Sequence, residues 1–389
     1  MSFGRAGEKG LPLCENQSLQ TAAKFRLLVV RLGAMGDILH ALPAVTALRM
    51  AHPEWRIDWV VDPRWQALLS AGNKPQGIAD VEVGIAKAET ETAGCRGAAQ
   101  PLVDRIHLAP ARDWSRRLLA PKTITEIRQL RRAMRADAYD ATLDFQGAVR
   151  SAAIARLAHS GRVIGEAEPR ERIARWLFNE RVRTCGTHVI EQDVELASAV
   201  AGDALEPVKP LLPVDAEAES WCVKVLLEKL KPPVLINPGA GWGAKRWPPE
   251  RYGAVAQGLV DRGYEVLVNT GPGEESLAQV IVQATKGAAR LLMPSLSHLI
   301  ALTRRVVLCI AGDSGPLHLA CALGRPVVGI YGPTDPARNG PFGTRSRVLR
   351  SPSSRRDHSR KADPEAGLLT IHPEEVLRAA DELLAREEE

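Results

Sequence analysis

The sequence predicts an α/β protein in which two domains, each built on a parallel sheet, face one another across a cleft. Two apolar runs, Phe25–Val30 and Pro233–Ile236, each lead into a glycine-containing loop, as buried parallel strands do. Each run is followed by alternating helix and strand patterns. Between the two halves, three prolines recur within Leu205–Ala216, which disfavours helix and central strand and indicates a linker or a long surface loop.

The length and composition fit this organisation. The chain has 389 residues, 45% hydrophobic and 25% charged, which is typical of soluble globular proteins and too long for one average core. Lysine and arginine number 51 and aspartate and glutamate 46, so the formal net charge is +5. That charge suits an anionic substrate or a membrane surface, but it is far below the basic density of a dedicated nucleic-acid binder.

Cysteine usage and hydropathy favour a cytoplasmic protein. The six cysteines form no CxxC pair, and Cys309 and Cys321 lie in apolar segments where we expect buried packing roles. No apolar run approaches the ~18–20 residues that span a bilayer. The segment before Lys24 lacks the apolar core of a signal peptide, so we expect a flexible tail over residues 1–23 and only peripheral membrane contact.

In the first half, periodicity predicts five elements around a polar insertion. They are strands at Phe25–Val30, Ile57–Val61 and Ala141–Leu143 and helices at Ile38–Met50 and Ile124–Met134. Gly84–Gln100 is small, polar and without apolar period, which predicts an exposed loop insertion.

The second half alternates more regularly. We expect strands at Pro233–Ile236, Glu265–Asn269, Ala289–Met293, Arg305–Ile310 and Val327–Tyr331, and helices at Pro249–Arg262, Glu274–Thr285, Leu296–Thr303 and Leu317–Leu323. Ser351–Ala366 is rich in Ser, Arg, Asp and Pro, which predicts a mobile segment. Pro373–Arg386 has the apolar spacing of an amphipathic helix. Ligands of such folds bind at the carboxyl ends of the strands, so the loops there carry the candidate site.

The first glycine loop places Asp37 directly after Gly36, near the start of the next helix. An aspartate there can simply cap the helix, although Gly33 and Gly36 also let the backbone approach a ligand. Pro43 implies either a kink or a helix that begins near Leu42, and in the second case the Asp37 carboxylate is free to act as a base. The glycine spacing does not fit GxGxxG, which disfavours a dinucleotide-dependent redox enzyme.

The loop over residues 311–318 joins a strand to a helix, with Pro316 suited to the first helical position. Its backbone N–H groups and the positive helix end suit a diphosphate, whereas Asp313 or Ser314 can also be a plain cap. His318 faces either the ligand or the core. Lys245, after the second glycine loop, can neutralise a departing phosphate without a metal, or it is a solvated loop lysine.

Two further sets of charged residues have both a functional and a structural explanation. Glu274 and Glu275 can accept ribose hydroxyl hydrogen bonds or complement a helix N-terminus. Seven arginines make the first half locally basic and can hold phosphate or carboxylate groups of an acidic acceptor, or form a solvated face: Arg112, Arg116, Arg117, Arg150, Arg162, Arg170 and Arg172. The run from Arg112 to Arg117 also suits an anionic membrane. No D-x-D occurs, so a metal-bridged nucleotide site is unsupported.

Four segments together resemble a known family, the ADP-heptose:lipopolysaccharide heptosyltransferases of glycosyltransferase family 9. They are RLGAMGDILHALPAVTALR (Arg31–Arg49), FQGAVRSAAIARL (Phe145–Leu157), AKRWPPERY (Ala244–Tyr252) and GDSGPLHLACALGRPVVGIYGPTDP (Gly312–Pro336), which come in the family's order over most of Lys24–Ser351. DFQGAVRSA, the Arg170-Glu171 pair and HVIEQDVELA are most similar to heptosyltransferase I, while KRWP and DSGPLH also occur in heptosyltransferase II-like members.

The resemblance implies two Rossmann-like domains in the GT-B arrangement and a metal-independent, inverting transfer with no cofactor. It implies ADP-L-glycero-D-manno-heptose as donor, Kdo-lipid A of the lipopolysaccharide inner core as acceptor, no nucleic-acid partner, and peripheral contact at the cytoplasmic face of the inner membrane. We therefore expect an acceptor-binding domain over residues 24–204, a linker over 205–216, and an ADP-sugar-binding domain with a terminal helix over 217–389.

The resemblance also implies roles for individual residues. Asp37 corresponds to the base, Lys245 to the donor-phosphate lysine, and Glu275 to the ribose-binding glutamate, with Glu274 one position away. The remaining donor-binding residues are Asp313, Ser314, Gly315 and His318, and the acceptor-binding arginines are Arg112, Arg116 and Arg170. The sequence departs from the family at the N-terminal tail, at Gly84–Gln100, and at Asn237–Ala244, which carries Gly and Trp where heptosyltransferase I members often have hydroxyl residues.

Other function classes remain open on sequence alone. One is a heptosyltransferase II-like enzyme or another GT-B nucleotide-sugar enzyme, such as a different sugar transferase or an epimerase. A second is a non-enzymatic protein that binds a sugar phosphate or a lipid surface, and a third is an NAD-dependent dehydrogenase. A donor screen, a product assay and an NADH absorbance assay separate them.

Overall fold

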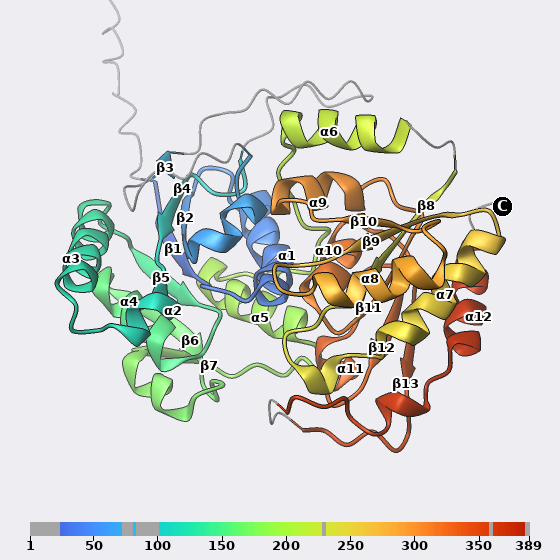
Figure 1. Ribbon diagram of the computed structural model, residues 1–389. Helices are drawn as coiled ribbons and strands as arrows, with labels where there is room; N and C mark the ends of the chain where they lie inside the picture. Colours follow the sequence, from blue (N-terminus) through green and yellow to red (C-terminus); the bar gives the residue numbers. More distant parts are fainter. Residues whose placement is uncertain (1–23, 72–80, 83–100, 228–230, 358–360, 386–389) are drawn as a thin grey trace, which may run out of the picture.

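The computed structural model describes residues 24–71, 81–82, 101–227, 231–357 and 361–385. The predictions for residues 1–23 and for Gly84–Gln100 lie outside the described residues. The described chain forms two lobes, each a parallel sheet with helices on both faces (Figure 1). The predicted α/β fold with two Rossmann-like sheets is confirmed.

The first lobe is built on a seven-stranded sheet. Its strands are, in spatial order, β3 (Val81–Glu82), β4 (Arg105–Leu108), β2 (Arg56–Val61), β1 (Arg26–Val30), β5 (Ala141–Asp144), β6 (Arg162–Glu166) and β7 (Glu180–Val182). All neighbours pair in parallel except β3 with β4. In the central register, Leu27 of β1 lies opposite Ile57 and Ala141.

The second lobe is built on a six-stranded, wholly parallel sheet. Its strands are, in spatial order, β10 (Arg290–Leu292), β9 (Glu265–Asn269), β8 (Pro233–Asn237), β11 (Leu308–Gly312), β12 (Val327–Tyr331) and β13 (Ser346–Arg350). If the short antiparallel edge strand β3 is set aside, both sheets follow the strand order 3-2-1-4-5-6 of the dinucleotide-binding fold.

Helices of the first lobe divide between the two faces of its sheet. Toward the second lobe lie α1 (Met35–Ala51) and α5 (Val189–Ala201), and the outer face carries α2 (Ala111–Arg116), α3 (Pro121–Ala136), α4 (Val149–Leu157) and the 3₁₀ segment η2 (Arg172–Leu177). A further 3₁₀ segment, η1 (Pro63–Leu68), follows β2. Leu27 and Val29 share a core with α1, and this core continues into Leu317 of the second lobe. Leu28 and Val30, whose side chains point the other way, belong to the outer core.

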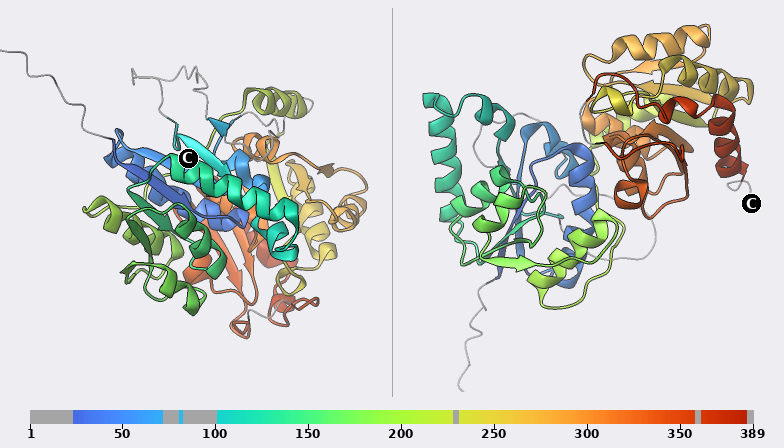
Figure 2. Two further views of the ribbon diagram at one scale, coloured as in Figure 1. Left: turned by 90° about the vertical axis from the view of Figure 1, so that its left-hand side faces the viewer. Right: turned by 90° about the horizontal axis from the view of Figure 1, so that it is seen from below.

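Helices of the second lobe enclose its sheet. They are α6 (Ala216–Leu227), α7 (Pro249–Asp261), α8 (Glu275–Ala284), α9 (Leu296–Thr303), α10 (Gly315–Ala322), α11 (Pro336–Asn339) and α12 (Pro373–Leu384), with 3₁₀ segments η3 (Gly243–Lys245) and η4 (Leu368–Thr370). The terminal amphipathic helix is confirmed, because α12 buries Val376, Ala380 and Leu383 in the core that it shares with α7. Figure 2 shows α12 as the dark red helix of the second lobe next to the C-terminus. Cys309 and Cys321 are buried as expected.

The prediction of a mobile segment over Ser351–Ala366 is not supported by its described parts, which are held by backbone hydrogen bonds. Asp357 N donates to Pro333 O at 3.1 Å, and Ala244 N donates to Lys361 O at 3.1 Å. A Cβ on Gly243 would collide with the carbonyl oxygen of Ala362, so the segment sits directly on the second glycine loop. The polar composition of the segment agrees with its mostly exposed side chains, but composition does not reveal which backbone groups form hydrogen bonds.

The chain between the lobes has neither helix nor strand over residues 204–215. It contacts both lobes, because Leu211 N donates to Thr46 Oγ1 of α1 at 3.2 Å and Arg304 Nη2 donates to Pro213 O at 2.9 Å. The domain boundaries at residues 204/205 and 216/217 stay a prediction. Among the described helices, none combines the length and the apolarity needed to cross a membrane.

Candidate functional site

Both sheets have a point between their first and fourth strands where the strand order reverses, and ligands of such sheets bind outside the carboxyl ends there. In the first lobe this point lies between β1 and β5, and in the second between β8 and β11. Asp37 follows β1, Lys245 follows β8 and Asp313 follows β11. Three of the predicted site residues therefore fall at these two points.

Arg31 anchors the loop that carries Asp37. Its Nε donates to Asp37 O at 3.1 Å, its Nη2 lies 3.5 Å from Asp37 Oδ1, and its Nη1 donates to Phe145 O in the loop after β5. The Leu32 N–H donates to Gln146 Oε1 at 2.9 Å, which ties the same two loops together. The Arg31 side chain is buried while that of Asp37 is 37% exposed, so a fixed cation supports a carboxylate with one open side.

The interpretation that the first helix begins near Leu42 is wrong. Helix α1 begins at Met35 and contains Pro43, which packing on nearly all sides of the helix tolerates. Asp37 therefore lies in the first turn, where its Oδ2 accepts a hydrogen bond from Ala34 N at 2.9 Å. The carboxylate does cap the helix, and its capping bond fixes the orientation of a group that is still partly exposed.

The N-termini of α1 and α10 meet between the lobes. A Cβ on Gly36 would lie 2.8 Å from Cδ2 of His318, and a Cβ on Gly315 would lie 2.6 Å from Sδ of Met35. Glycine at both positions is what lets the two helix ends approach so closely. Gly36, which precedes Asp37 in the chain, thus packs against His318 of the opposite lobe.

In the second lobe, the Lys245 ammonium pairs with the Asp313 carboxylate. Both side chains are largely buried, at 12% and 7% exposure. The Lys245 Nζ also lies 4.1 Å from the ring centroid of Trp242, a cation–π contact. Burial alone would raise the pKa of Asp313, but the hydrogen bond from His318 and the charge of Lys245 hold that pKa well below its ordinary value.

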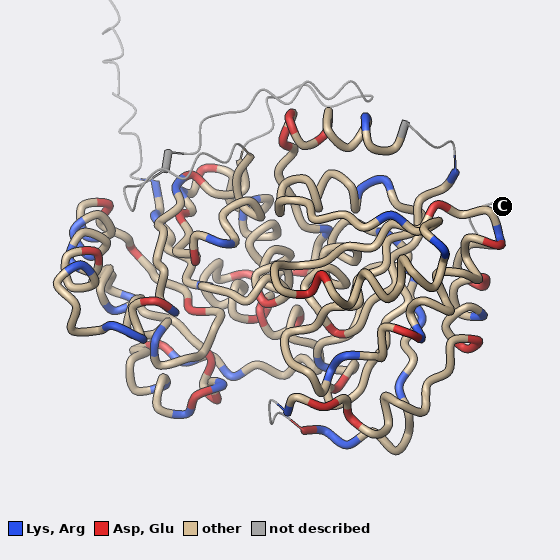
Figure 3. The backbone as a smooth tube through the Cα atoms, in the orientation of Figure 1, with Lys and Arg blue, Asp and Glu red and all other residues tan. Residues whose placement is uncertain are grey.

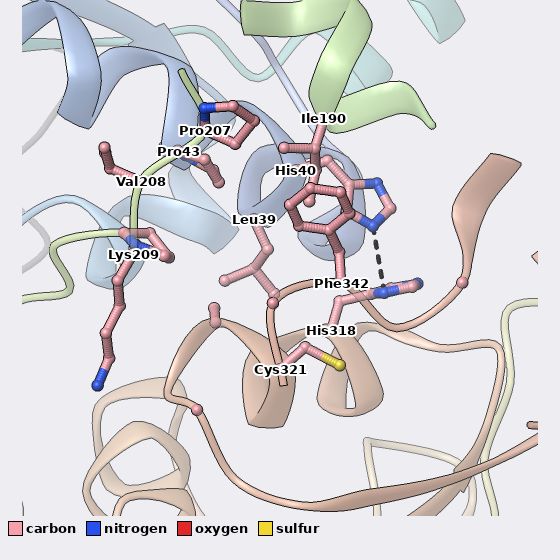
Figure 4. A pocket seen from close by; sticks show the side chains of 15 residues that line it. Leu39, His40, Pro43, Ile190, Pro207, Val208, Lys209, His318, Cys321 and Phe342 are labelled. Carbon is pink, nitrogen blue, oxygen red and sulfur yellow. Dashed lines mark hydrogen bonds between the residues drawn. The ribbon is translucent and has the colours of Figure 1, made fainter. Parts of the chain in front are cut away.

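His318 is 6% exposed and lies between the lobes, where it lines a cavity together with His40. Its Nε2 is 3.1 Å from Asp313 Oδ1 and its Nδ1 is 3.2 Å from Nε2 of His40 (Figure 4). Ser314 occupies the N-cap position of α10 without a side-chain capping bond, and Gly315 is the first helical residue. The N–H groups at this helix end are therefore not satisfied by that side chain, an arrangement that suits an anionic group.

The two glutamates after β9, Glu274 and Glu275, make different contacts. A Cβ on Gly239, in the loop after β8, would collide with the Glu274 carboxylate, which also lies 3.8 Å from Arg246. Glu275 instead bonds to backbone at the start of its own helix, and the N–H groups of Glu275 itself and of Gly273 lower the pKa of its carboxyl group. Glu274 thus reaches the second glycine loop and Glu275 does not, while the role of Glu275 as the ribose ligand stays a prediction.

The predicted acceptor arginines are exposed and lie at the carboxyl edge of the first sheet. Arg170 is the best placed of them, because its backbone N lies 3.1 Å from a Cβ built on Gly147, in the loop after β5. Arg112 and Arg116 are on α2, which follows β4, two strands away from β1. The structure therefore brings Arg170 next to the β5 loop and leaves Arg112 and Arg116 further along the same edge.

Three residues of the site were missed from sequence: Arg31, His40 and Asp193. Asp193, on α5, is 2% exposed and its Oδ2 has no hydrogen-bond partner among the described residues. Burial raises the pKa of Asp193 to about 7, and Arg31 and Asp37 are among the charges that act on it. A carboxylate in the buried stripe of α5 beside Ile190 and Val194 was a signal that periodicity could have identified.

Asp58, His107 and Asp137 form a buried group whose potential ligand atoms lie within 4.8 Å of one another. Arg56 Nη2 donates to both carboxylates, at 2.7 and 2.8 Å, and Arg105 Nη1 lies 2.9 Å from Asp137 Oδ2. Two guanidinium groups thus already compensate the negative charge and oppose a cation. The group is an internal charge network of the first lobe.

Known proteins resemble this chain in sequence and in fold. Residues 127–368, more than half of the chain, match the sequence model of glycosyltransferase family 9 (heptosyltransferase). Lipopolysaccharide heptosyltransferase 1 of Escherichia coli (strain K12) is 28% identical over 332 residues, which are 84% of this chain and 94% of that protein. Lipopolysaccharide heptosyltransferase 2 of the same strain is 32% identical over 191 residues, which are 46% of this chain and 55% of that protein. The structure of E. coli heptosyltransferase WaaC with ADP has the same fold, with a TM-score of 0.71 and 24% identity over 92% of this chain and 100% of that one.

Proposed function

The chain belongs to glycosyltransferase family 9, the heptosyltransferases, and we propose that it moves L-glycero-D-manno-heptose from ADP-heptose to the Kdo region of the lipopolysaccharide inner core. The observation that supports this proposal is the meeting of two helix ends between the lobes. One carries the partly exposed Asp37, and the other follows Asp313, the partner of Lys245. A base and a phosphate-binding group then lie on opposite sides of one site.

The proposed reaction is a single displacement. An acceptor hydroxyl oxygen attacks the anomeric carbon of the heptose while the Asp37 carboxylate takes its proton. The bond from that carbon to the β-phosphate oxygen breaks, and ADP leaves with the electron pair from the opposite face, which inverts the anomeric configuration. A nucleoside diphosphate is already a good leaving group, so one carboxylate is chemically sufficient.

Lys245 and the α10 helix end are proposed to hold the donor diphosphate. The N-terminal N–H groups of α10 and its positive dipole end stabilise the charge that develops on ADP. Lys245 is now paired with Asp313, so donor binding requires its ammonium to turn toward the diphosphate. Glu274, which lies over Gly239, is the carboxylate best placed to accept hydrogen bonds from ribose hydroxyls.

The acceptor side is proposed to use the arginines at the carboxyl edge of the first sheet. Kdo carries a carboxylate, and guanidinium groups bind carboxylates with two parallel hydrogen bonds. Arg170 borders the β5 loop, which Arg31 and Gln146 tie to the Asp37 loop. Arg112 and Arg116 continue the same edge and suit the more distant anionic groups of a lipid A.

The first lobe is also proposed to contact the cytoplasmic face of the inner membrane. Four large apolar side chains are 60–90% exposed on segments that follow β4 and β6: Leu118, Leu119, Ile173 and Trp176. Arg175 and Arg181 flank the Trp176 ring at 4.9 and 5.4 Å from its centroid. Lys and Arg also recur along α3, and in the lower-left part of this lobe they are interspersed with Asp and Glu (Figure 3). Apolar side chains among arginines suit an anionic bilayer surface.

Vesicle sedimentation tests the membrane contact. Anionic phosphatidylglycerol vesicles are expected to bind the protein more strongly than zwitterionic phosphatidylcholine vesicles, and less strongly as salt rises. The double variant Leu118→Ser/Leu119→Ser and the variant Trp176→Ser should each weaken this binding. Met293→Ser, at a residue that is 59% exposed on the second lobe, is the matched control. Equal binding by all four proteins would remove these residues from the contact.

The transfer itself is tested by incubating the protein with ADP-heptose and Kdo-lipid A and measuring the mass of the glycolipid. We expect an increase of one heptose that depends on the ADP carrier and is absent with UDP or GDP sugars. The similarity to heptosyltransferase 2 over about half of the chain supports a second candidate, in which the acceptor already carries a heptose. Addition only to that heptosylated acceptor would favour the second candidate, and no product on either would contradict the proposed activity.

A further inference from the structure

A row of hydrogen-bonded side chains joins the two lobes next to the proposed site. His40 lies on α1, three residues after Asp37, and is 6% exposed. Its Nε2 is 3.2 Å from His318 Nδ1, the His318 Nε2 is 3.1 Å from Asp313 Oδ1, and Asp313 pairs with Lys245. The row therefore runs from the helix that carries the proposed base to the lysine proposed to bind the diphosphate.

The chemistry of the row assigns the donor at each step. The pKa of Asp313 lies well below its ordinary value, so its carboxylate is ionised and can only accept. His318 must then donate from Nε2, and in a neutral ring its Nδ1 is left as an acceptor. Burial and the neighbouring histidines hold the pKa of His40 well below its ordinary value, so His40 stays neutral and donates from Nε2 to His318.

Among the described residues, His318 is the hydrogen-bond partner of the His40 ring, whereas the His318 ring is also held by Asp313. The third nearby histidine, His188, is occupied elsewhere, because its Nδ1 accepts from Ile190 N and its Nε2 lies 3.1 Å from Gly340 O. Beside the pair is a cavity of about 230 Å³ lined by α1, α10 and the interlobe chain (Figure 4). Open space on that side means that close packing does not hold the rings there.

We propose that His40 is a positioning residue for the donor site. From the first lobe it fixes the tautomer and orientation of His318, and through His318 it keeps the Asp313 carboxylate in place when Lys245 turns to the donor diphosphate. Without this support, a buried carboxylate would lose both its cation and its second hydrogen bond, which carries a large desolvation cost. This inference rests on the proposed function, since the diphosphate is what draws Lys245 away.

Two substitutions separate hydrogen bonding from packing. His40→Leu removes the N–H donor while keeping an apolar side chain, and His40→Gln keeps an N–H donor at a similar distance along the side chain. We expect His40→Leu to weaken ADP binding roughly tenfold and to raise the KM for ADP-heptose more than it lowers kcat. We expect His40→Gln to restore most of the affinity. Cys321→Ala, which changes packing on α10 beside the same cavity, is the control and should bind ADP as the unaltered protein does.

Equal ADP affinity in His40→Leu and the unaltered protein would overturn the inference, and so would equal losses in the Leu and Gln variants, which would indicate a packing role. Imidazole nitrogen NMR gives an independent readout. In the neutral rings, His40 and His318 should both carry their proton on Nε2, and a His318 protonated on Nδ1 would contradict the assignment. ADP binding needs no sugar transfer, so absence of glycolipid product would count against the proposed function alone.

Discussion

The two lobes share one sheet topology but differ in the chemistry at the point where strand order reverses. In the first lobe that point carries Asp37, 37% exposed and supported by a buried arginine. In the second it carries Lys245 and Asp313, which are 12% and 7% exposed and neutralise one another. The common fold sets where a ligand can lie, and in the proposed function a few loop side chains decide whether that place takes up a proton or holds a phosphate.

The difference in exposure has a mechanistic meaning. A base must be reached by an incoming hydroxyl, whereas groups that stabilise charge act most strongly when water is excluded. The reversal point of the first lobe, at Asp37, is therefore the open side of the site, and that of the second lobe, at Lys245 and Asp313, is the closed side. Substitutions at each point should consequently affect different kinetic quantities, with the largest effect at the proposed base and the smallest at the ribose.

Asp37→Asn is expected to separate catalysis from donor binding. The amide oxygen can still accept the Ala34 N–H bond, so the fold and the start of α1 should persist, but the amide cannot take up a proton. We expect kcat to fall about 10³-fold, within the range of general-base effects, with ADP affinity unchanged. Steady-state kinetics and calorimetric titration with ADP measure the two quantities. Transfer at nearly the unaltered rate would remove Asp37 from the role of base.

Lys245→Met is expected to act mainly on the donor. Loss of the ammonium removes a charge-assisted bond to the diphosphate and leaves Asp313 buried without its cation. We expect ADP affinity to fall roughly 10–100-fold, as for loss of a hydrogen bond to a charged group. Lys245→Arg is the matched control, because it keeps the charge and should retain part of the affinity. An unchanged ADP affinity in Lys245→Met would place the diphosphate elsewhere.

Asp193→Asn tests whether the buried carboxyl group of Asp193, near Arg31 and Asp37, lowers the free energy of unfolding. The pKa of Asp193 is raised from 3.8 to about 7, so the folded protein binds the extra proton between these values. The contribution of protonated Asp193 to the free energy of unfolding is therefore fully present below pH 3.8 and is lost as the pH rises through the folded-state pKa of about 7. Asp193→Asn should raise the free energy of unfolding above neutral pH by about 1–3 kcal/mol, and by less at mildly acidic pH.

Urea unfolding of both proteins at a mildly acidic and a mildly alkaline pH measures this difference. Asp203→Asn offers a control carboxylate, because Asp203 is exposed just after the same helix. A stability difference between Asp193→Asn and the unaltered protein that does not depend on pH would show that the carboxyl group is not titrating in this range.

Glu274→Gln and Glu275→Gln are expected to have the smallest effects on ADP affinity, and comparing them shows which glutamate binds the ribose. Glu274 lies over Gly239 in the second glycine loop, whereas Glu275 bonds to backbone at the start of its own helix. If Glu274 receives the ribose hydroxyls, its substitution should weaken ADP binding about fivefold, and Glu275→Gln should change it by less than about twofold. The reverse order in calorimetric titrations would restore Glu275 as the ribose ligand.

Sequence patterns predicted the fold well because each half repeats a signal that depends only on local residues. Apolar strands that end at glycine loops placed Asp37, Lys245 and Asp313 at strand ends, and parallel pairing then brought those ends to common edges. The same reasoning left open whether Pro43 marks a kink or a helix start near Leu42, and the structure excludes the second alternative. A largely buried helix can lose one backbone hydrogen bond when packing with α5 and α10 stabilises it.

The residues that sequence did not find act across long distances in the chain. His40 meets His318, 278 positions later, and Arg31 donates to Phe145 O, 114 positions later. No periodicity in one segment encodes such a pairing, since it depends on how the two lobes and two adjacent loops are brought together. The choice between Glu274 and Glu275 similarly depends on the direction of one side chain at a helix start.

The most direct test of the central claim is a crystal structure of the protein with a fluorinated, non-transferable ADP-heptose analogue. It should show the diphosphate between Lys245 and the start of α10, with Lys245 turned away from Asp313. The Asp37 carboxylate should face the anomeric carbon from the side opposite the diphosphate, with room between them for an acceptor hydroxyl within hydrogen-bond reach of the carboxylate. An analogue bound outside the space between the lobes, or an Asp37 carboxylate on the same side of the sugar as ADP, would contradict the account.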